Sequence, residues 1–361
     1  MKPLSWGHPG AVAGAPRCRP AADWSGASWR VAWPGAGWAC SYAAAGAACG
    51  VGALLPGAAA AVLGPVLLVG LVGLGVAHGA CDQLVLPAHR GGAGPGRRYL
   101  LRFGAGYVAL AVGAGLVWWQ WPAAAMALFV GLTGWHWGSA DAPAHPRRGV
   151  WVAHSLLRGA LLLELPLAAW PTETARHVDG LLALAGAPAV TASSWAGPTV
   201  ALGGLVLVGH GALWAYFAHQ RTPGRWHRDA AEVALLGALF TALPPLLGLG
   251  VYFVFWHSLQ HVLRLTPLLG YAPGPARTWP ALGQELAFFV RRAWPMLLAS
   301  LAAGVGAYAL GQAWLPAHDA WLGLAVLAAS VLTLPHALLV SLIMDAPKWR
   351  ARPRGAQAGG C

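Results

Sequence analysis

The chain has 361 residues, of which 57% are hydrophobic and 9% are charged, and its 23 basic and 11 acidic residues give a net charge of +12. Soluble domains carry charge on roughly a quarter of their residues, so this composition excludes an ordinary soluble domain, and its hydrophobicity excludes a disordered chain. The long apolar runs instead predict an all-α, polytopic transmembrane helical bundle. The basic residues cluster between these runs, which is typical of membrane proteins and argues against nucleic-acid binding.

We expect three regions along the chain. Residues 1–36 are rich in Gly, Pro, Ala and Trp and lack a continuous apolar stretch, which predicts a flexible leader rather than a cleavable signal peptide. Residues 37–345 contain the apolar runs and form the transmembrane domain. Residues 346–361 carry a lysine and three arginines between Lys348 and Arg354 and form a basic, flexible tail.

The bundle is expected to contain about ten helices (8 to 10). The apolar stretches are residues 37–55, 57–85, 99–119, 121–140, 149–170, 198–218, 230–243, 246–266, 294–314 and 320–344. Most are long enough to cross about 30 Å of hydrocarbon. The stretch 230–243 is short, and a tight turn is expected after it, at Pro244 and Pro245. Arginine-rich gaps alternate with gaps that are nearly free of basic residues, which predicts a multi-pass cell-membrane protein with both termini in the cytoplasm.

Histidines inside the apolar stretches form the strongest candidate site, because an ionisable group in a bilayer is costly and by default marks function. His78, His136, His257 and His261 all map to the cytoplasmic half of the predicted bundle. His257 and His261, four residues apart, present their imidazoles on one helix face about 6 Å apart. This pattern predicts a metal or haem site; the alternative is four separate histidines, each donating to a backbone carbonyl.

Acidic residues follow two of these histidines closely. Asp82 lies four residues after His78 and Asp141 five residues after His136, so each could accept the second ring proton of a ligand imidazole. Asp141 fits equally well as a solvated charge beside the next arginines. Three more histidines map to the same half of the membrane, and each alone fits a hydrogen-bonded core residue better than a ligand: His154, His210 and His336.

Four short segments carry a resemblance to a known family. They are HGACDQL (78–84), WHWGSAD (135–141), FVFWHSLQH (253–261) and SVLTLPHALLV (330–340). In this order and at these separations they resemble the Brp/Blh family of integral-membrane β-carotene 15,15'-dioxygenases, over about residues 57–345. The resemblance implies that His78, His136, His257 and His261 bind a non-haem iron, Fe(II), while His336 matches a family histidine to which no role is assigned.

One position departs from the family pattern. The family has a histidine directly after the Asp of its first motif, whereas this chain has Gln83. A glutamine can still donate and accept hydrogen bonds, but it binds iron or moves a proton less readily. With Asp82, Asp141 and His336, Gln83 is expected to surround the iron ligands rather than to hold the metal, so the substitution puts rate or substrate preference in doubt.

The resemblance implies a carotenoid-cleavage domain over residues 37–345. Iron and dioxygen would cleave β-carotene at its central double bond into two molecules of retinal, which would serve a microbial rhodopsin. Because the polyene is apolar, it partitions into the bilayer and can enter a membrane-embedded site laterally. Aromatic residues beside the histidines are candidates for the wall of the polyene pocket: Trp135, Trp137, Phe255 and Trp256.

Three alternatives stay open. A bis-histidine haem protein would need axial ligands facing each other from different helices, which the His257–His261 pair fits less well than a mononuclear site. A transporter would use discontinuous helices with polar groups at the midplane, whereas these histidines lie off the midplane. A non-catalytic relative that assists an opsin or delivers retinoid is the third, and Gln83 is the observation that motivates it.

Overall fold

The computed structural model describes residues 35–89, 95–188, 192–220, 223–274, 277–311 and 320–349. Within these ranges every regular element is helical, which confirms the all-α class. The elements are α1 (Ala36–Leu54), η1 (Pro56–Ala58), α2 (Ala59–Gly70), η2 (Leu71–Val76), α3 (Ala77–Gly79), α4 (Asp82–His89), α5 (Arg97–Gln120), α6 (Pro122–Asp141), α7 (Arg148–Ala169), α8 (Pro171–Leu184), α9 (Ala192–His219), α10 (Pro223–Ala242), α11 (Pro245–Val251), η3 (Tyr252–Ser258), α12 (Leu259–Leu265), α13 (Trp279–Gly311), α14 (Ala320–Leu339), η4 (Val340–Met344) and α15 (Ala346–Trp349). Most of the predicted leader and tail, residues 1–34 and 350–361, lies outside the described residues.

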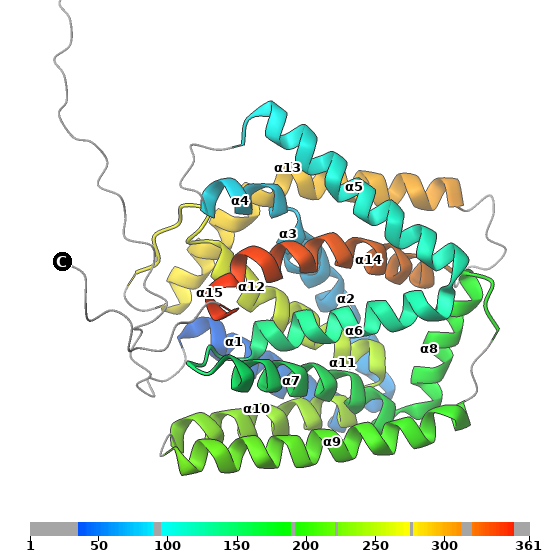
Figure 1. Cartoon of the computed structure of the whole chain (residues 1–361), viewed down its shortest axis with the longest axis vertical. Helices are drawn as coiled ribbons and strands as arrows, with labels where there is room; N and C mark the ends of the chain where they lie inside the picture. The colour runs from blue at the N-terminus through cyan, green and yellow to red at the C-terminus, as the bar shows by residue number, and fades with distance from the viewer. Residues whose placement is uncertain are drawn as a thin grey trace, which may run out of the picture. The chain divides into compact units, whose positions relative to one another are not determined.

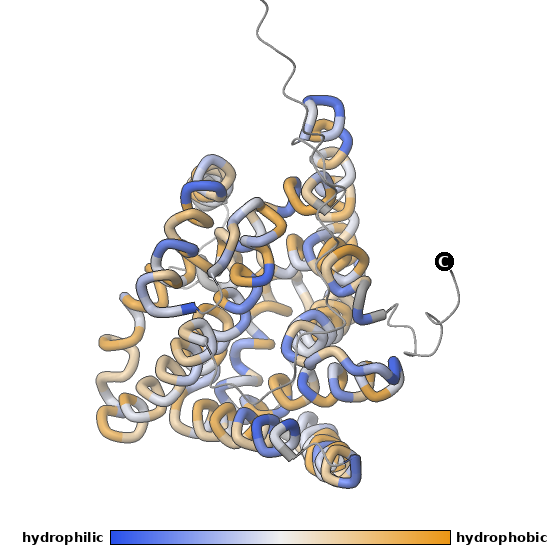
Figure 2. The backbone as a smooth tube through the Cα atoms, turned by 90° about the vertical axis from the view of Figure 1, so that its left-hand side faces the viewer, coloured by the Kyte–Doolittle hydropathy of each residue, from blue (hydrophilic) through white to orange (hydrophobic). Residues whose placement is uncertain are grey.

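The helices form a polytopic bundle, as predicted. Seven segments of the described chain are long and apolar enough to cross a membrane: Pro56–Gly79, Arg97–Gln120, Arg148–Ala169, Ser194–His219, Pro245–Leu265, Trp279–Gly306 and Gly323–Met344. The remaining predicted stretches form α1, α6 and α10, which are helical but fall outside this set. Figure 2 shows hydrophobic residues along the helices, with hydrophilic residues at helix ends and among the packed helices.

Two predicted boundaries can be compared directly with the helices. α10 ends at Ala242 and α11 begins at Pro245, so the chain breaks at the predicted proline pair. α13 begins at Trp279, well before the apolar stretch that starts at 294, and it includes the exposed Arg291 and Arg292. A helix of 33 residues rises about 50 Å, which exceeds the hydrocarbon thickness, so charged residues are tolerated within it.

α6 and α7 pack closely because glycines line their contact. A Cβ atom added at Gly138 would lie 2.0 Å from the carbonyl oxygen of Ser155, and one added at Gly159 would lie 2.1 Å from that of Gly134. Small residues allow membrane helices to approach at backbone distance. Figure 1 shows α6 and α7 side by side, with α9 and α10 on the far side of α7. The contact fixes the last turns of α6, which carry His136.

A buried network of charges joins α7 to α10. The Nη2 atom of Arg158 lies 2.6 Å from Oδ1 of Asp229 and 2.5 Å from Oε2 of Glu232. His154 contacts the same Asp229 oxygen at 2.7 Å, and the indole of Trp214 donates to its other oxygen. The partners that Arg158 requires inside the bundle are therefore supplied by the first turns of α10.

Three π-helical turns interrupt the described helices, and each lies beside a histidine. η2 ends two residues before His78, η3 includes His257, and η4 begins four residues after His336. A π-helical turn contains one residue more than an α-helical turn and occurs mostly as a local bulge at functional sites. The bulges therefore lie close in sequence to three of the clustered histidines.

Candidate metal centre

Five histidines from four separate parts of the chain meet inside the bundle. They are His78 of α3, His136 of α6, His257 of η3, His261 of α12 and His336 of α14. Each is at most 7% exposed to solvent. The structure thus brings the four histidines singled out as iron ligands together, and it adds His336 to them.

The imidazole rings are close enough to face a common point. The shorter ring-centroid distances are 4.9 Å for His78–His336 and His136–His257, 5.0 Å for His136–His336, 5.2 Å for His78–His261, 5.4 Å for His261–His336 and 5.7 Å for His78–His257. Rings that bind one ion through nitrogens at about 2 Å have centroids about 3 Å from it, so neighbouring rings lie about 4 to 6 Å apart. The observed spacing fits one metal ion.

Several ring nitrogens of this cluster lack partners in the described part of the chain. Both nitrogens of His136, both of His257 and Nε2 of His336 are buried and make no hydrogen bond to a described residue. Buried polar atoms normally have a partner, because an unmet hydrogen bond in an apolar interior costs free energy. A metal ion would satisfy these nitrogens together, which is the observation that fits the residues to a metal.

The other two histidines are partly held by protein groups. Nδ1 of His78 donates to the carbonyl oxygen of Gly75 at 2.5 Å, which leaves its Nε2 lone pair for a ligand. Nη2 of Arg264 lies 3.4 Å from Nδ1 of His261. As the side chains stand, no three His, Cys, Asp or Glu residues of the described ranges hold their donor atoms in a ready coordination geometry. Metal binding therefore requires the rings to turn.

The two acidic residues singled out in the sequence occupy different positions around the cluster. Asp82 contacts Nδ1 of His336 at 2.9 Å, instead of bonding its helical neighbour His78. Asp141 accepts a hydrogen bond from the hydroxyl of Tyr252 at 3.0 Å. Each carboxylate is thus tied to a residue on another helix.

Three further polar residues lie outside the cluster. Gln83 donates to the carbonyl oxygen of Ala80 at 3.1 Å, within its own helical turn. His154 bonds Asp229 in the charge network, and Nδ1 of His210 donates to the carbonyl oxygen of Val206 at 2.9 Å. These residues make structural contacts within single helices or between α7 and α10.

Of the four aromatic residues expected beside the polyene, Trp137 contacts the cluster. Its ring centroid lies 5.8 Å from that of His257. Trp135 donates to Ser341 and packs edge-on against Trp151. Trp256 packs against Trp38 and Tyr42 of α1. Phe255 joins Trp256 in the same hydrophobic core.

Phe253 contacts the cluster although the sequence reasoning did not select it. Its ring stacks on His257, with centroids 5.9 Å apart and planes 14° apart, and it meets His78 edge-on at 5.6 Å. Phe253 precedes His257 by four residues, so helical spacing places both on one face. That spacing is a signal that could have identified it.

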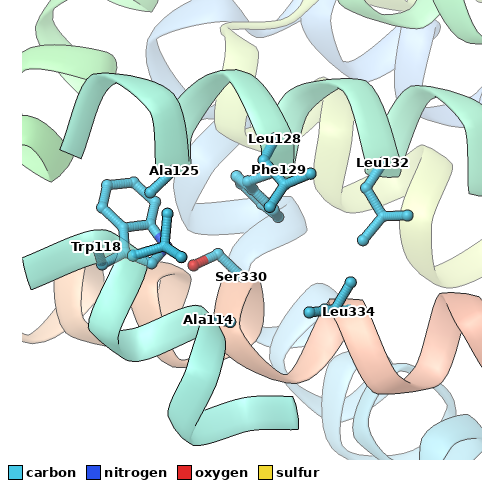
Figure 3. A pocket seen from close by; sticks show the side chains of 9 residues that line it. Ala114, Trp118, Ala125, Leu128, Phe129, Leu132, Ser330 and Leu334 are labelled. Carbon is cyan, nitrogen blue, oxygen red and sulfur yellow. The ribbon is translucent and has the colours of Figure 1, made fainter. Parts of the chain in front are cut away.

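Two cavities flank the cluster along α6. One has a volume of 170 Å³ and polar walls that include Asp141, Gln260, Arg264 and His257. The other is an apolar slot of 20 Å³ between α5, α6 and α14, lined by Ala114, Val117, Trp118, Ala125, Leu128, Phe129, Leu132, Ser330 and Leu334. Figure 3 shows Trp118 and Ala125 near one end of the slot, and Leu132 and Leu334 near the other.

The apolar slot points toward the histidines. Leu132 is one helical turn before His136 on α6, and Leu334 is two residues before His336 on α14. The hydroxyl of Ser330 donates to the carbonyl oxygen of Leu327 at 2.7 Å, so its hydrogen bond is satisfied within its own helix. His257 thus borders the larger cavity, and one end of the slot lies within about one helical turn of His136 along α6 and of His336 along α14.

Comparison with known proteins shows the family of the chain. A family model described as β-carotene 15,15'-dioxygenase matches residues 69–344, a range that includes all five clustered histidines. The probable β-carotene 15,15'-dioxygenase Blh of Halobacterium salinarum is 32% identical over 321 residues, covering 80% of this chain and 88% of that protein. No solved structure matches the chain. The chain belongs to the β-carotene 15,15'-dioxygenase family.

Proposed function

We propose that the protein cleaves β-carotene at its central 15,15' double bond with dioxygen, giving two molecules of all-trans-retinal. The observation that carries this proposal is the meeting of buried, partly unpartnered imidazoles inside the bundle of a chain from this family. The carbon–carbon double bond and the oxygen–oxygen bond break while two carbonyl bonds form. The reaction balances without an external reductant or proton.

His78, His136, His257 and His261 are the proposed ligands of Fe(II). Imidazole nitrogen suits iron, copper and zinc alike, so the donor set alone does not select the ion. Iron is proposed because the sequence resemblance implies it and because zinc has no redox chemistry. When bound, iron supplies the redox chemistry by which dioxygen reacts with an alkene.

The protein side chains would position the substrate and exclude water. Phe253 and Trp137 cover His257 with aromatic surface, which suits contact with a conjugated chain. Tyr252 and Asp141 are hydrogen-bonded to each other and link η3 to the end of α6, so they keep His257 and His136 in register. Trp135, Phe255 and Trp256 would support these helices from behind.

The apolar slot is the proposed site for one half of the polyene. The distance along α6 from Ala125 to His136 is about 16 Å at the helical rise, and extended β-carotene is about as long as the ~30 Å hydrocarbon core. Half of the substrate therefore spans the slot when its central bond lies beside the histidines. The slot is narrow in this structure, so binding requires α5 to move away from α14.

The membrane would act as the substrate reservoir. Seven apolar helices place the site within reach of lipid, from which an apolar polyene can enter laterally. We extend the proposal to the cell membrane, with both termini in the cytoplasm, from the distribution of arginines between the apolar stretches. The retinal produced would suit a microbial rhodopsin as its consumer.

Expression in cells that accumulate β-carotene tests the proposal. The expected result is loss of carotene with formation of retinal, measured by chromatography, and no conversion by His257→Ala expressed at the same level. If the carotene stays unchanged although the protein purified from the same cells contains iron, β-carotene is not the substrate. Full activity of His257→Ala would contradict the assignment of the ligands.

A further inference from the structure

His336 occupies a central place among the five histidines. Its ring centroid lies 4.9 Å from that of His78, 5.0 Å from His136 and 5.4 Å from His261. The ring-centroid distances between neighbouring rings within the group of four proposed ligands range from 4.9 to 6.4 Å, so the distances of His336 fall in the shorter part of that range. His336 is therefore as close to the common point as the residues assigned to the metal.

The hydrogen bonds of His336 leave one nitrogen free. Nδ1 lies 2.9 Å and 3.1 Å from the two carboxylate oxygens of Asp82, so Nδ1 carries a proton and donates it. Nε2 is buried and has no partner among the described residues. No described residue satisfies Nε2 in either charge state of the ring, and a lone pair is available there only when the ring is neutral.

Asp82 is itself held in place from other directions. The hydroxyl of Tyr107 on α5 donates to Oδ2 of Asp82 at 3.2 Å. Asp82 is the first residue of α4, where the helix dipole favours a negative charge. Metal-bound histidines commonly donate their second ring nitrogen to a carboxylate, which fixes the tautomer and the ring orientation. Tyr107, Asp82 and His336 form such a chain, ending at an unpartnered nitrogen inside the cluster.

We propose that His336 is a fifth metal ligand through Nε2, and that Asp82 is a positioning residue that holds its ring with the help of Tyr107. The proposal rests on the proposed function, because it concerns the same metal. A fifth imidazole would leave fewer open positions on the metal for dioxygen. The absorption of bound Co(II), which is sensitive to the number of ligands, provides a readout that needs no turnover.

The test uses the full chain purified in detergent, titrated anaerobically with Co(II) and followed by its visible absorption. We expect His336→Gln to weaken Co(II) binding at least 10-fold and to change the band, and Asp82→Asn to weaken binding about 10- to 100-fold. Imidazole added to His336→Ala should restore the wild-type band. Gel filtration and far-ultraviolet circular dichroism verify that each variant is folded.

His210→Gln is the matched control. His210 is also buried, donates through Nδ1 to an oxygen, and has no partner for Nε2 among the described residues, but its ring contacts Trp214 rather than the cluster. We expect wild-type Co(II) affinity and absorption from this variant. If His210→Gln loses as much Co(II) affinity as His336→Gln, both losses come from altered packing and the proposal is wrong.

His257→Gln separates this proposal from the proposed function. If His257→Gln loses Co(II) while His336→Gln binds it with wild-type affinity and absorption, His336 is not a ligand and the four-histidine site stands. If both variants bind like the wild type, the metal site itself is wrong. If imidazole fails to restore the band of folded His336→Ala, the role of His336 is structural and the proposal falls.

Discussion

The ring of Phe253 lies nearly parallel to the imidazole of His257, with their planes 14° and their centroids 5.9 Å apart. Aromatic pairs contribute about 0.5 to 1.5 kcal/mol beyond the area that they bury. We expect Phe253→Leu to lower the rate of retinal formation by about 2- to 10-fold, because the variant lacks the aromatic ring that orients His257. Phe255→Leu, which alters the core beside α1, is the control, and its rate per folded protein should stay near the wild-type value. Equal losses in both variants would contradict a specific role for Phe253.

Gly138→Ala should displace the end of α6. The added methyl group would meet the Ser155 carbonyl oxygen at 2.0 Å, and backbone atoms of α7 cannot rotate away. We expect a loss of about 1 to 3 kcal/mol in stability, typical of overpacking, and lower iron occupancy because His136 is two residues away. Thermal unfolding in detergent and metal analysis measure the two effects.

Gly131→Ala provides the control on the same helix. A Cβ atom at Gly131 meets nothing within 4 Å, so alanine gains helix propensity worth up to about 1 kcal/mol. The two substitutions should therefore change the melting temperature in opposite directions. Destabilisation of similar size by both would show that the α6–α7 contact is not the cause.

Ala114→Phe should block the apolar slot. Ala114 faces the slot from α5, and a benzyl group there would fill the space proposed for half of the polyene. We expect β-carotene cleavage to fall at least 10-fold while iron content stays unchanged.

Ala109→Phe controls for the added bulk on α5. Ala109 is exposed on the same helix and does not line the slot. We expect Ala109→Phe to cleave β-carotene at the wild-type rate and Ala114→Phe to lose this activity. Normal cleavage of full-length β-carotene by Ala114→Phe would place the polyene elsewhere.

Arg158→Met should destabilise the bundle strongly, because it leaves Asp229 and Glu232 buried without their shared partner. Breaking a buried pair typically costs about 3 to 5 kcal/mol. Arg228 also pairs with Glu232, but half of its side chain is exposed, and such pairs contribute about 1 kcal/mol or less. Chemical unfolding of Arg158→Met and Arg228→Met should show this difference, and equal effects would contradict it.

The class of fold and the break at Pro244 follow from local properties of the chain. Apolar length and proline act within a few residues, so they can be read from the sequence directly. The start of α13 could not be read from the sequence in this way. The stretch before Pro295 mixes charged and apolar residues, and it continues the helix beyond the thickness of the hydrocarbon core. Local composition thus predicts where most helices lie but not where each one begins.

The contacts that shape the site depend on residues far apart in the sequence. Asp82 follows His78 by four residues, but its carboxylate meets His336, 254 residues away. Arg158 likewise finds Asp229 on another helix. The π-helical turns are equally hidden, because in a segment that is apolar on every face an extra residue leaves no mark on the hydrophobic pattern.

The π-helical turns imply that each of these segments holds one residue more than an α-helical turn needs. Removing one residue from Tyr252–Ser258 would let that turn take α-helical geometry while the helix beyond it keeps its rotation, so His261 would keep its place. The residues inside the turn, which include His257, would instead change their positions around the helix axis. The widened turn therefore bears on the direction of His257 rather than on the helix that follows it.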